Sequence, residues 1–522
     1  DLRMSRGLGD VYKRQVLGHL IGPGLFCPFE KRFLLMFPIF VFCAHLSGSY
    51  FTLAKVSVHL HLLERPILAQ RTFNFARVQR NIFLFFPLST MPKRPNTAPS
   101  QSTTLAPISP WCAAIFCRVV DNMGDAGVCW RLVKHLSALG LPALLIIDEP
   151  EVLARMLPAL SAEETLKRIV TVEGEGGEVG IVHWSLIEER ANAGELSIIG
   201  GHWPRLVLET FGCRLPDSVE EGLNDGLTRL WMNLEYLSAE GYAEDCHGVW
   251  GAHPRLPLKK LWFYPGFTSK TGGLLFSPKD ELRTAPLALH ARRTELLTRF
   301  GANPAQKVLF VFTYPSYPLE MLAHTLKALP ESITVLLTPG AAGETLKGLL
   351  KESQHEVISL PYLSQNDFDE VIWESDLAII RGEESFVRAQ LGAAPFIWSI
   401  YPTEDYAHEV KLDAWLARLE SVAKAPEEKA AFQLLSKTTR DWVRPVVLEG
   451  AEKEKQCYAR EESESKECEA FTRDFLALWE KLPEAKHLAQ LWREALLSHG
   501  DLASAILRAL EAQTGDISRA EV

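Results

Sequence analysis

The chain has 522 residues, of which 47% are hydrophobic and 23% charged, and its 55 basic and 65 acidic side chains give a net charge of −10. Such an acidic chain does not suggest a protein that binds nucleic acid regardless of sequence, because that activity needs a basic face for the phosphates.

The first 90 residues differ in character from the rest. Ser5–Gln15 resembles the translation of a transposon adapter used in sequencing libraries, and the residues after it show no steady hydrophobic period. We therefore interpret residues 1–90 as a non-native leader, with a natural start at Met91 and a disordered tail over 91–110. A basic and apolar stretch, 31–46, resembles part of a signal peptide, but it is shorter than the ~20 residues that a membrane span needs.

The remaining 432 residues carry a more negative net charge than the whole chain does. The leader carries 11 basic and 4 acidic side chains, so residues 91–522 carry −17. This length predicts two domains. No zinc spacing and no C-x-x-C pair is present, and the odd number of cysteines is typical of free thiols in a reducing cytoplasm. The cysteines are Cys112, Cys117, Cys129, Cys213, Cys246, Cys457 and Cys468.

The first half alternates short apolar runs with amphipathic stretches. Short apolar runs fit buried parallel strands, and a period of 3.6 with a closing glycine fits a helix. We expect strands within 113–120, 142–150, 179–185 and 204–212, and a helix over 127–140.

The pattern then restarts, with a join near 278–305. It predicts strands in 306–315, 332–340 and 394–402, a helix over 319–330, and a strand, turn and helix within 376–392. Alternating strands and helices indicate a doubly wound α/β sheet in each half. The domains are expected at 111–280 and 281–450, followed by a charged helical extension over 451–522.

The loop after the first strand, "DNMGDAG" (121–127), holds two carboxylates. Asp125 could cap the following helix, where a negative charge suits the N-terminus. One acid would suffice for capping, whereas Asp121 and Asp125 together suit proton abstraction or the orientation of a cationic substrate. The residues alone leave both interpretations open.

A second strand-to-helix turn, "IIRGEESFVRAQ" (379–390), also combines charges. Arg381, Ser385 and the free N–H groups of the helix start could bind a phosphate. Glu383 and Glu384 beside them are unusual for a plain phosphate site. They could instead form an acid-rich first turn of the kind that is common in helices.

These segments, with "VVDNMGDAGVCWRL", "NLEYLSAE" (233–240) and "YPGFTSKTGGL" (264–274), make the chain similar to the protein-arginine rhamnosyltransferases (EarP family) that modify bacterial translation elongation factor P. The resemblance runs from about Ile115 to Leu419. It implies a GT-B fold, in which two Rossmann-like domains face a cleft. It also implies inverting transfer of rhamnose from TDP-β-L-rhamnose to an arginine side chain of elongation factor P, which activates the factor for rescue of stalled ribosomes.

The resemblance also assigns residues. It implies that Asp121, Asp125 and Glu383 are catalytic, with Asp125 as general base. The donor contacts that it implies are Arg381, Glu384, Ser385, Tyr362, Gln365, Phe368, Tyr314 and Tyr401. Glu384 stands where the family has aspartate, and Met123 where an aromatic residue is expected.

The implied chemistry needs no cofactor besides the donor substrate. A carboxylate pair can hold a guanidinium and accept its proton, while Arg381 and a helix N-terminus can stabilise the leaving diphosphate, so no metal is required. "DFD" (367–369) is interpreted as a loop and helix cap rather than a metal motif. We expect elongation factor P and TDP-rhamnose as partners, and neither nucleic acid nor membrane.

Two other functions stay open from the sequence. One is a TDP-sugar glycosyltransferase with a small-molecule or glycan acceptor. The other is a non-catalytic nucleotide-sugar-binding partner of the translation factor.

Overall fold

The computed structural model describes residues 110–120, 123–174, 176–277, 286–403, 406–445 and 457–514. All of these residues belong to one compact unit. The predicted leader, 1–90, and nearly all of the predicted tail, 91–110, lie outside the described residues. The six cysteines whose side chains are described are free thiols.

The first domain is built on an eight-stranded sheet with the order β3-β4-β2-β1-β5-β6-β8-β7. Its pairs are parallel except for the two at the ends, β3 with β4 and β7 with β8. The strand order reverses at β1, so a crevice opens beside its carboxyl end, where ligands of such sheets bind. The strands are β1 (Ala113–Cys117), β2 (Ala143–Ile147), β3 (Val170–Glu173), β4 (Glu178–His183), β5 (Leu206–Thr210), β6 (Leu230–Leu234), β7 (Trp250–Ala252) and β8 (Lys259–Phe263).

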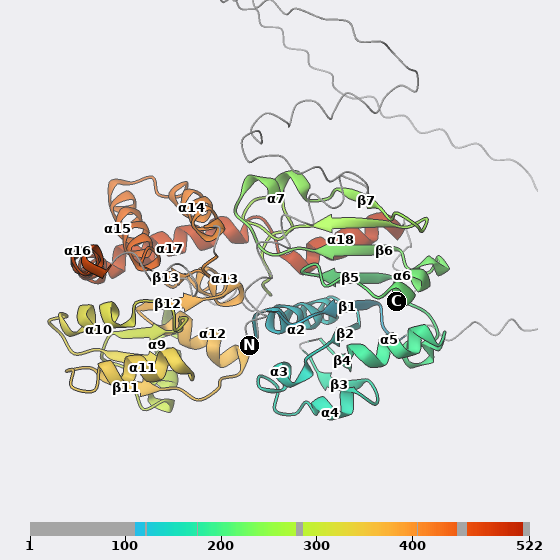
Figure 1. Cartoon of the computed structure of the whole chain (residues 1–522), viewed down its shortest axis with the longest axis horizontal. Coiled ribbons are helices and arrows are strands. Elements are labelled where there is room, and N and C mark those ends of the chain that lie inside the picture. The colour runs from blue at the N-terminus through green and yellow to red at the C-terminus, as the bar shows by residue number, and fades with distance from the viewer. Residues whose placement is uncertain are drawn as a thin grey trace, which may run out of the picture. The chain divides into compact units, whose positions relative to one another are not determined.

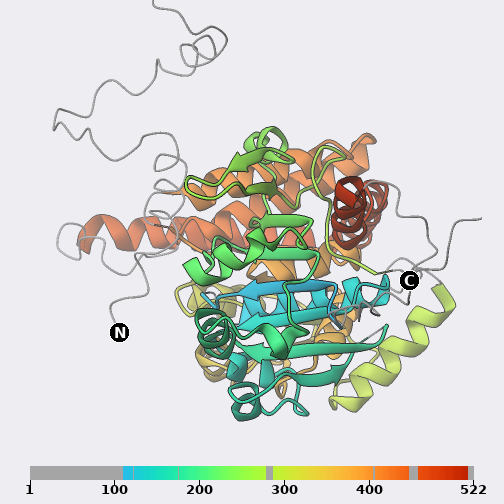
Figure 2. The same cartoon turned by 90° about the vertical axis from the view of Figure 1, so that its right-hand side faces the viewer.

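Helices cover both faces of this sheet, because successive side chains of its strands point to opposite sides. Ala113, Ile115 and Cys117 of β1 pack into one core, and Ala114 and Phe116 pack into the other. Figure 2 faces this domain, with its blue to green strands in the foreground. Its helices are α2 (Met123–Ala138), α3 (Pro150–Ala154), α4 (Ala162–Thr165), α5 (Trp184–Asn192), α6 (Asp217–Gly222) and α7 (Gly241–Cys246), with 3-10 turns at Leu196–Ile199 and Leu223–Asp225.

The second domain has a five-stranded, fully parallel sheet with the order β11-β10-β9-β12-β13. Here the order reverses at β9, which places the crevice between the carboxyl ends of β9 and β12. The strands are β9 (Val308–Val311), β10 (Thr334–Leu337), β11 (Glu356–Ser359), β12 (Leu377–Arg381) and β13 (Phe396–Ser399). Its helices are α9 (Pro286–Arg299), α10 (Leu319–Lys327), α11 (Ala341–Leu349), α12 (Gln365–Glu374), α13 (Glu383–Leu391), α14 (Ala407–Glu420), α15 (Pro426–Val443) and α16 (Cys457–Glu480).

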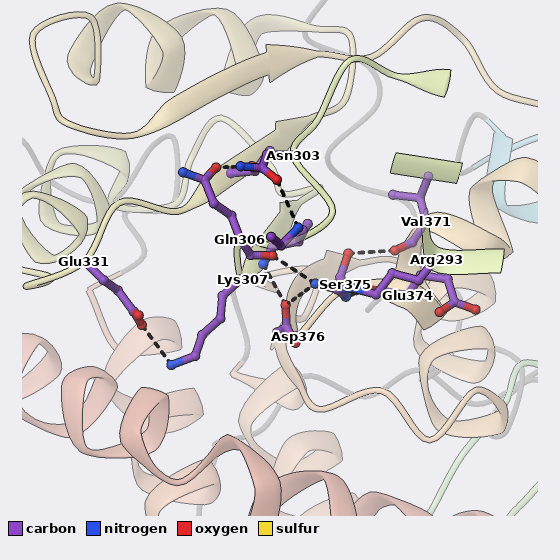
Figure 3. Close-up of polar contacts among 12 residues, drawn as sticks. Arg293, Asn303, Gln306, Lys307, Glu331, Val371, Glu374, Ser375 and Asp376 are labelled. Atoms are coloured by element: carbon purple, nitrogen blue, oxygen red, sulfur yellow. Dashed lines mark hydrogen bonds and ion pairs between the residues drawn. The ribbon is translucent and has the colours of Figure 1, made fainter. Parts of the chain in front are cut away.

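An ion-paired arginine ties α9 to the amino edge of the second sheet (Figure 3). The Arg293 guanidinium donates to the Asp376 carboxylate at 2.7 Å and to the Gln306 carbonyl at 3.1 Å, and it also contacts the Glu374 carbonyl. The same Asp376 oxygen accepts the Val308 N–H at 2.7 Å. Polar contacts therefore fasten α9 to this edge of the sheet.

The last two helices connect the domains. Helix α17 (Leu482–Leu497) packs with the second domain, and α18 (Leu502–Thr514) returns to pack on α2 of the first (Figure 1). The turn between them passes the "YPGFTSKTGGL" segment, where the Leu502 N–H donates to the Leu274 carbonyl at 2.9 Å. A Cβ on Gly273, whose φ is +75°, would lie 2.4 Å from the Gly500 carbonyl oxygen, so this close approach requires glycine.

The predicted α/β class and the pairing of two Rossmann-like domains in a GT-B fold are confirmed. The strands expected from apolar runs are present, although shorter than the runs. The sequence analysis missed β3, β6, β7, β8 and β11. Some of these are short and lie at sheet edges, where polar side chains interrupt the apolar signal.

The buried face of α18 should contribute to the stability of the first domain. Ile506 is fully buried in its core, so Ile506→Ala should lower the free energy of unfolding by about 3 kcal/mol. Urea denaturation followed by tryptophan fluorescence measures this change. Glu511→Ala, on the exposed side of the same helix, should change it by less than about 0.5 kcal/mol. Equal unfolding midpoints for the two variants would show that the buried face of α18 does not stabilise the first domain.

Candidate active site

A cavity of about 320 Å³ lies where the crevices of the two sheets meet. The first domain contributes the start of α2 and the end of α3, and the second contributes the loops after β9, β10, β11 and β12. Eight of the residues predicted from the sequence line it: Tyr314, Tyr362, Gln365, Phe368, Arg381, Glu383, Glu384 and Ser385. The sheet topology therefore gathers residues that lie far apart in the chain at one place.

Arg381 ends β12 and is held by aromatic rings. Its guanidinium carbon lies 4.6 Å from the ring centroids of both Phe312 and Tyr314, which follow β9. Cation–π contacts of this kind fix a guanidinium without neutralising it. Among the residues that the structure describes, no carboxylate contacts Arg381.

The start of α13 adds backbone donors beside Arg381. Gly382 adopts a φ of +73° at the N-cap, a conformation that favours glycine, and the helix begins at Glu383. Ser385 is buried in the first turn of this helix and lines the cavity. An arginine next to the free N–H groups of a helix start can bind an anion such as a phosphate.

Tyr362, Gln365 and Phe368, from the loop after β11 and the start of α12, also line the cavity. Phe368 packs edge-on against Phe312 with centroids 5.3 Å apart, whereas the Tyr362 side chain is 63% exposed. The Gln365 amide donates to the Gly127 carbonyl of α2 at 2.9 Å and so reaches across to the first domain. An exposed aromatic ring such as that of Tyr362 suits stacking on a planar group.

A buried ion cluster joins the domains at the wall of the cavity. Arg131 of α2 donates to Glu384 at 2.5 Å and pairs with Asp369 of α12 at 3.1 Å. Arg388 of α13 pairs with the same Asp369, also at 3.1 Å. The Arg131, Asp369 and Arg388 side chains are at most 5% exposed. The Glu384 carboxylate thus faces Arg131, and its predicted contact with the donor stays a prediction.

The sequence analysis did not single out Arg131 or Asp369 as site residues. A signal for Arg131 was present, since it is a charged residue among the apolar positions of an amphipathic helix. For Asp369, the "DFD" segment was interpreted as a loop and helix cap. Ser364 does cap α12 by accepting the Asp367 N–H at 3.2 Å, whereas Asp369 binds the two arginines.

Glu383 is engaged by two other groups. Its carboxylate contacts the Lys411 ammonium of α14, and its second oxygen accepts the Leu237 N–H at 3.3 Å. Leu237 belongs to the "NLEYLSAE" segment that follows β6. The carboxylate is therefore held from both domains while the residue lines the cavity.

The three remaining predicted site residues are not among the described residues that line the cavity. Asp121 lies outside the described residues. Asp125 is buried in the first turn of α2, where it accepts the Val120 N–H at 2.9 Å, while Met123, Gly124 and Gly127 around it line the cavity. Tyr401 does not line the cavity but contacts Tyr314 edge-on, with centroids 5.5 Å apart.

A second polar group is buried at the carboxyl ends of β5 and β6. Asn233 donates to Glu235 at 2.6 Å, and Lys260 donates to Glu209 at 2.8 Å. Burial raises the pKa of Glu235 to about 6, while the hydrogen bond from Asn233 opposes the rise and the charge of Glu209 adds to it. Burial therefore destabilises the ionised form of Glu235.

The described ranges hold neither a cluster of metal-binding side chains nor a helix suited to a membrane. Within them, no three or more His, Cys, Asp or Glu side chains are grouped so that they could hold a metal ion. None of the helices there combines the length and the apolar character that crossing a membrane requires.

The site lies between two Rossmann-like domains, and it brings together Arg381, several aromatic rings and the acids Glu383 and Glu384. This arrangement is that of a GT-B glycosyltransferase. The family model described as "Elongation-Factor P (EF-P) rhamnosyltransferase EarP" matches residues 113–511. The chain therefore belongs to the EF-P rhamnosyltransferase family.

Individual proteins are similar to this chain in sequence or in fold. The protein-arginine rhamnosyltransferase of Shewanella oneidensis is 34% identical over 337 residues, which cover 58% of this chain and 79% of that protein. The protein-arginine rhamnosyltransferase of Pseudomonas putida is 33% identical over 323 residues, 58% of this chain and 80% of that protein. A solved structure described as the basis for EarP-mediated arginine glycosylation of EF-P is 21% identical with a TM-score of 0.45, and the match covers 76% of this chain and 98% of that one.

The raised pKa of Glu235 predicts a pH-dependent gain in stability for Glu235→Gln. Between about pH 4.5 and pH 6 the folded protein holds a proton that the unfolded chain releases, so wild-type stability falls as the pH rises through this window. At pH 7.5 the variant should be more stable by about 2 kcal/mol, and at pH 4 this gain should be absent. Urea denaturation at both pH values measures it.

The exposed Glu221 supplies a matched control. Glu221→Gln should leave the unfolding midpoint unchanged at both pH values. A Glu235→Gln gain of equal size at pH 4 and pH 7.5 would contradict the raised pKa.

Proposed function

We propose that this chain transfers rhamnose from TDP-β-L-rhamnose to an arginine side chain of elongation factor P, with inversion at the sugar carbon. The observation that carries the proposal is the cavity itself. It brings Arg381 and the start of α13 together with the start of α2, whose first turn contains Asp125, in a chain of the EF-P rhamnosyltransferase family. A translation factor as acceptor implies that the enzyme works in the cytoplasm.

The second domain would hold the donor. Arg381, Ser385 and the N–H groups of α13 would bind the diphosphate, and the wall of Tyr362, Gln365 and Phe368 would hold the thymidine. As the bond to the sugar breaks, negative charge grows on the leaving TDP. Arg381 and the helix N-terminus would stabilise this charge. These groups supply the cationic role, so the proposed reaction needs no metal ion.

The first domain would hold the acceptor. A guanidinium is protonated at neutral pH and has no free lone pair for attack. Asp125, with Asp121, would orient the guanidinium and accept its proton as the nitrogen attacks the sugar carbon from the face opposite TDP. Glu383, which lines the same cavity, would hydrogen-bond the reacting groups between the two domains.

Intact-mass spectrometry of the acceptor tests the reaction as a whole. Residues 91–522 mixed with TDP-rhamnose and elongation factor P should add one deoxyhexose to the factor, also in the presence of a chelator. Asp125→Asn should slow this transfer by about 100-fold or more, because it removes the base. Asp217→Asn, at an exposed ion pair of the same domain, serves as the control with normal activity.

Each other result has a definite meaning. Transfer to free arginine or to sugars but not to the factor would favour a different acceptor. Tight TDP binding without any transfer would favour a non-catalytic partner of the factor. Normal transfer by Asp125→Asn would refute the role of this residue.

The role of Arg381 has a separate test. Arg381→Met should weaken TDP binding by about 10- to 100-fold, because a charge-assisted contact to the diphosphate is lost. Isothermal titration calorimetry measures this affinity. Arg440→Met removes an arginine that pairs with Asp413 on α14 and should bind TDP normally. An unchanged affinity of Arg381→Met would place the diphosphate elsewhere.

A further inference from the structure

Two acids lie close behind the cation that would bind the donor, separated from it in the sequence by Gly382 alone. Glu383 and Glu384 come two and three residues after Arg381, and all three line the cavity. A carboxylate that swung onto the Arg381 guanidinium would neutralise it by a bidentate contact and compete with a phosphate. Something must keep these acids away from Arg381.

The structure engages each acid with a cation from another element. Glu384 pairs with Arg131 of α2, and Glu383 pairs with Lys411 of α14. We propose that Lys411 is a positioning residue that fixes the Glu383 carboxylate beside the reaction centre and keeps it off Arg381. This inference rests on the proposed function of the same site and adds a residue that the sequence analysis did not assign.

The surroundings of Lys411 strengthen its ion pair with Glu383. The Lys411 and Glu383 side chains are only 28% and 27% exposed, and a small apolar pocket surrounds them. Burial acts against the Lys411 charge, but the Glu383 carboxylate outweighs it and raises the pKa of the ammonium above its ordinary value. The pocket is completed by Leu237, Ala239, Phe267, Phe386, Trp398 and Trp415.

Helix α14 does not need Lys411 in order to dock. Arg418, two turns further on, donates to the Ala239 carbonyl at 3.3 Å and pairs with Glu244 at 2.6 Å. Trp415 is buried and donates to the Gln390 side chain at 3.0 Å. These contacts hold the helix against both domains, so the Lys411 charge is left to act on Glu383.

Glu383 is also held at a second point. The Leu237 N–H, 3.3 Å from one carboxylate oxygen, leaves the other oxygen to Lys411. A side chain with three rotatable bonds keeps one orientation when both oxygens are held. Without Lys411, the cationic residue nearest to Glu383 along the chain is Arg381, at the end of the preceding strand.

A double-mutant cycle on TDP affinity tests the proposal without relying on turnover. Lys411→Met keeps the length of the side chain and removes its charge. It should weaken TDP binding by about tenfold, because the released carboxylate neutralises Arg381. Adding Glu383→Gln should restore the affinity to within about threefold of the wild type, since an amide cannot neutralise the guanidinium. Lys411→Arg should bind TDP nearly as the wild type does.

Other roles for Lys411 predict different results. A lysine that attracts the phosphates directly, or that merely supports the fold, gives the same loss in the Glu383→Gln background, and this result would overturn the proposal. An unchanged TDP affinity of Lys411→Met would overturn it too. Lys437→Met is the matched control, because it removes the lysine of a 2.7 Å ion pair with Asp474 from the neighbouring helix α15 and should bind TDP normally.

Turnover separates this inference from the proposed function. Wild-type enzyme that neither binds TDP nor modifies elongation factor P would refute the proposed function and this inference with it. Wild-type enzyme that does both, together with a Lys411→Met variant of normal affinity and normal kcat, would refute the inference alone. The expected result is an active wild type and a Lys411→Met variant whose kcat is also lowered by about 10- to 100-fold, because Glu383 is displaced.

Discussion

A cation that must stay available for a ligand cannot share its surroundings with unengaged carboxylates. At the carboxyl end of β12 the chain places Arg381 shortly before Glu383 and Glu384, and the structure meets this constraint by giving each acid its own cation. Aromatic rings, which cannot neutralise it, hold Arg381 instead. The distribution of charge around the cavity thus follows from the pairing of its acids.

The same pairing couples the site to the arrangement of the domains. The partner of Glu384 lies on α2 of the first domain, and the second contact of Glu383 is the Leu237 N–H of that domain. Because both acids are satisfied only when the domains are in place, the charge pattern of the site is a tertiary property. The return of α18 to the first domain, made possible by the glycine contact at Gly273, helps to hold that arrangement.

Because the charge pattern depends on tertiary contacts, the sequence could predict only part of the structure. Buried parallel strands are continuous apolar runs, so the central strands of both sheets were predictable, whereas polar and short strands such as β3 and β7 were not. The site loops were predictable as positions, because carboxyl ends of parallel strands meet at one edge. The pairing of Arg131 with Glu384 joins residues 253 positions apart, and no local pattern encodes it. The two glutamates therefore looked unusual for a phosphate site until their partners were known.

The carboxyl edge of the first sheet contains features that lower the stability of the fold. Phe211 and Arg214, after β5, adopt φ values of +54° and +55°, which cost about 1–3 kcal/mol each for residues other than glycine. Glu235, after the neighbouring β6, is buried with a raised pKa. Strain and a destabilised acid thus occur together on one edge, while the opposite faces of the sheet are packed with ordinary apolar side chains. Selection for stability alone would remove such features, so their occurrence on one edge is typical of a functional region of the sheet.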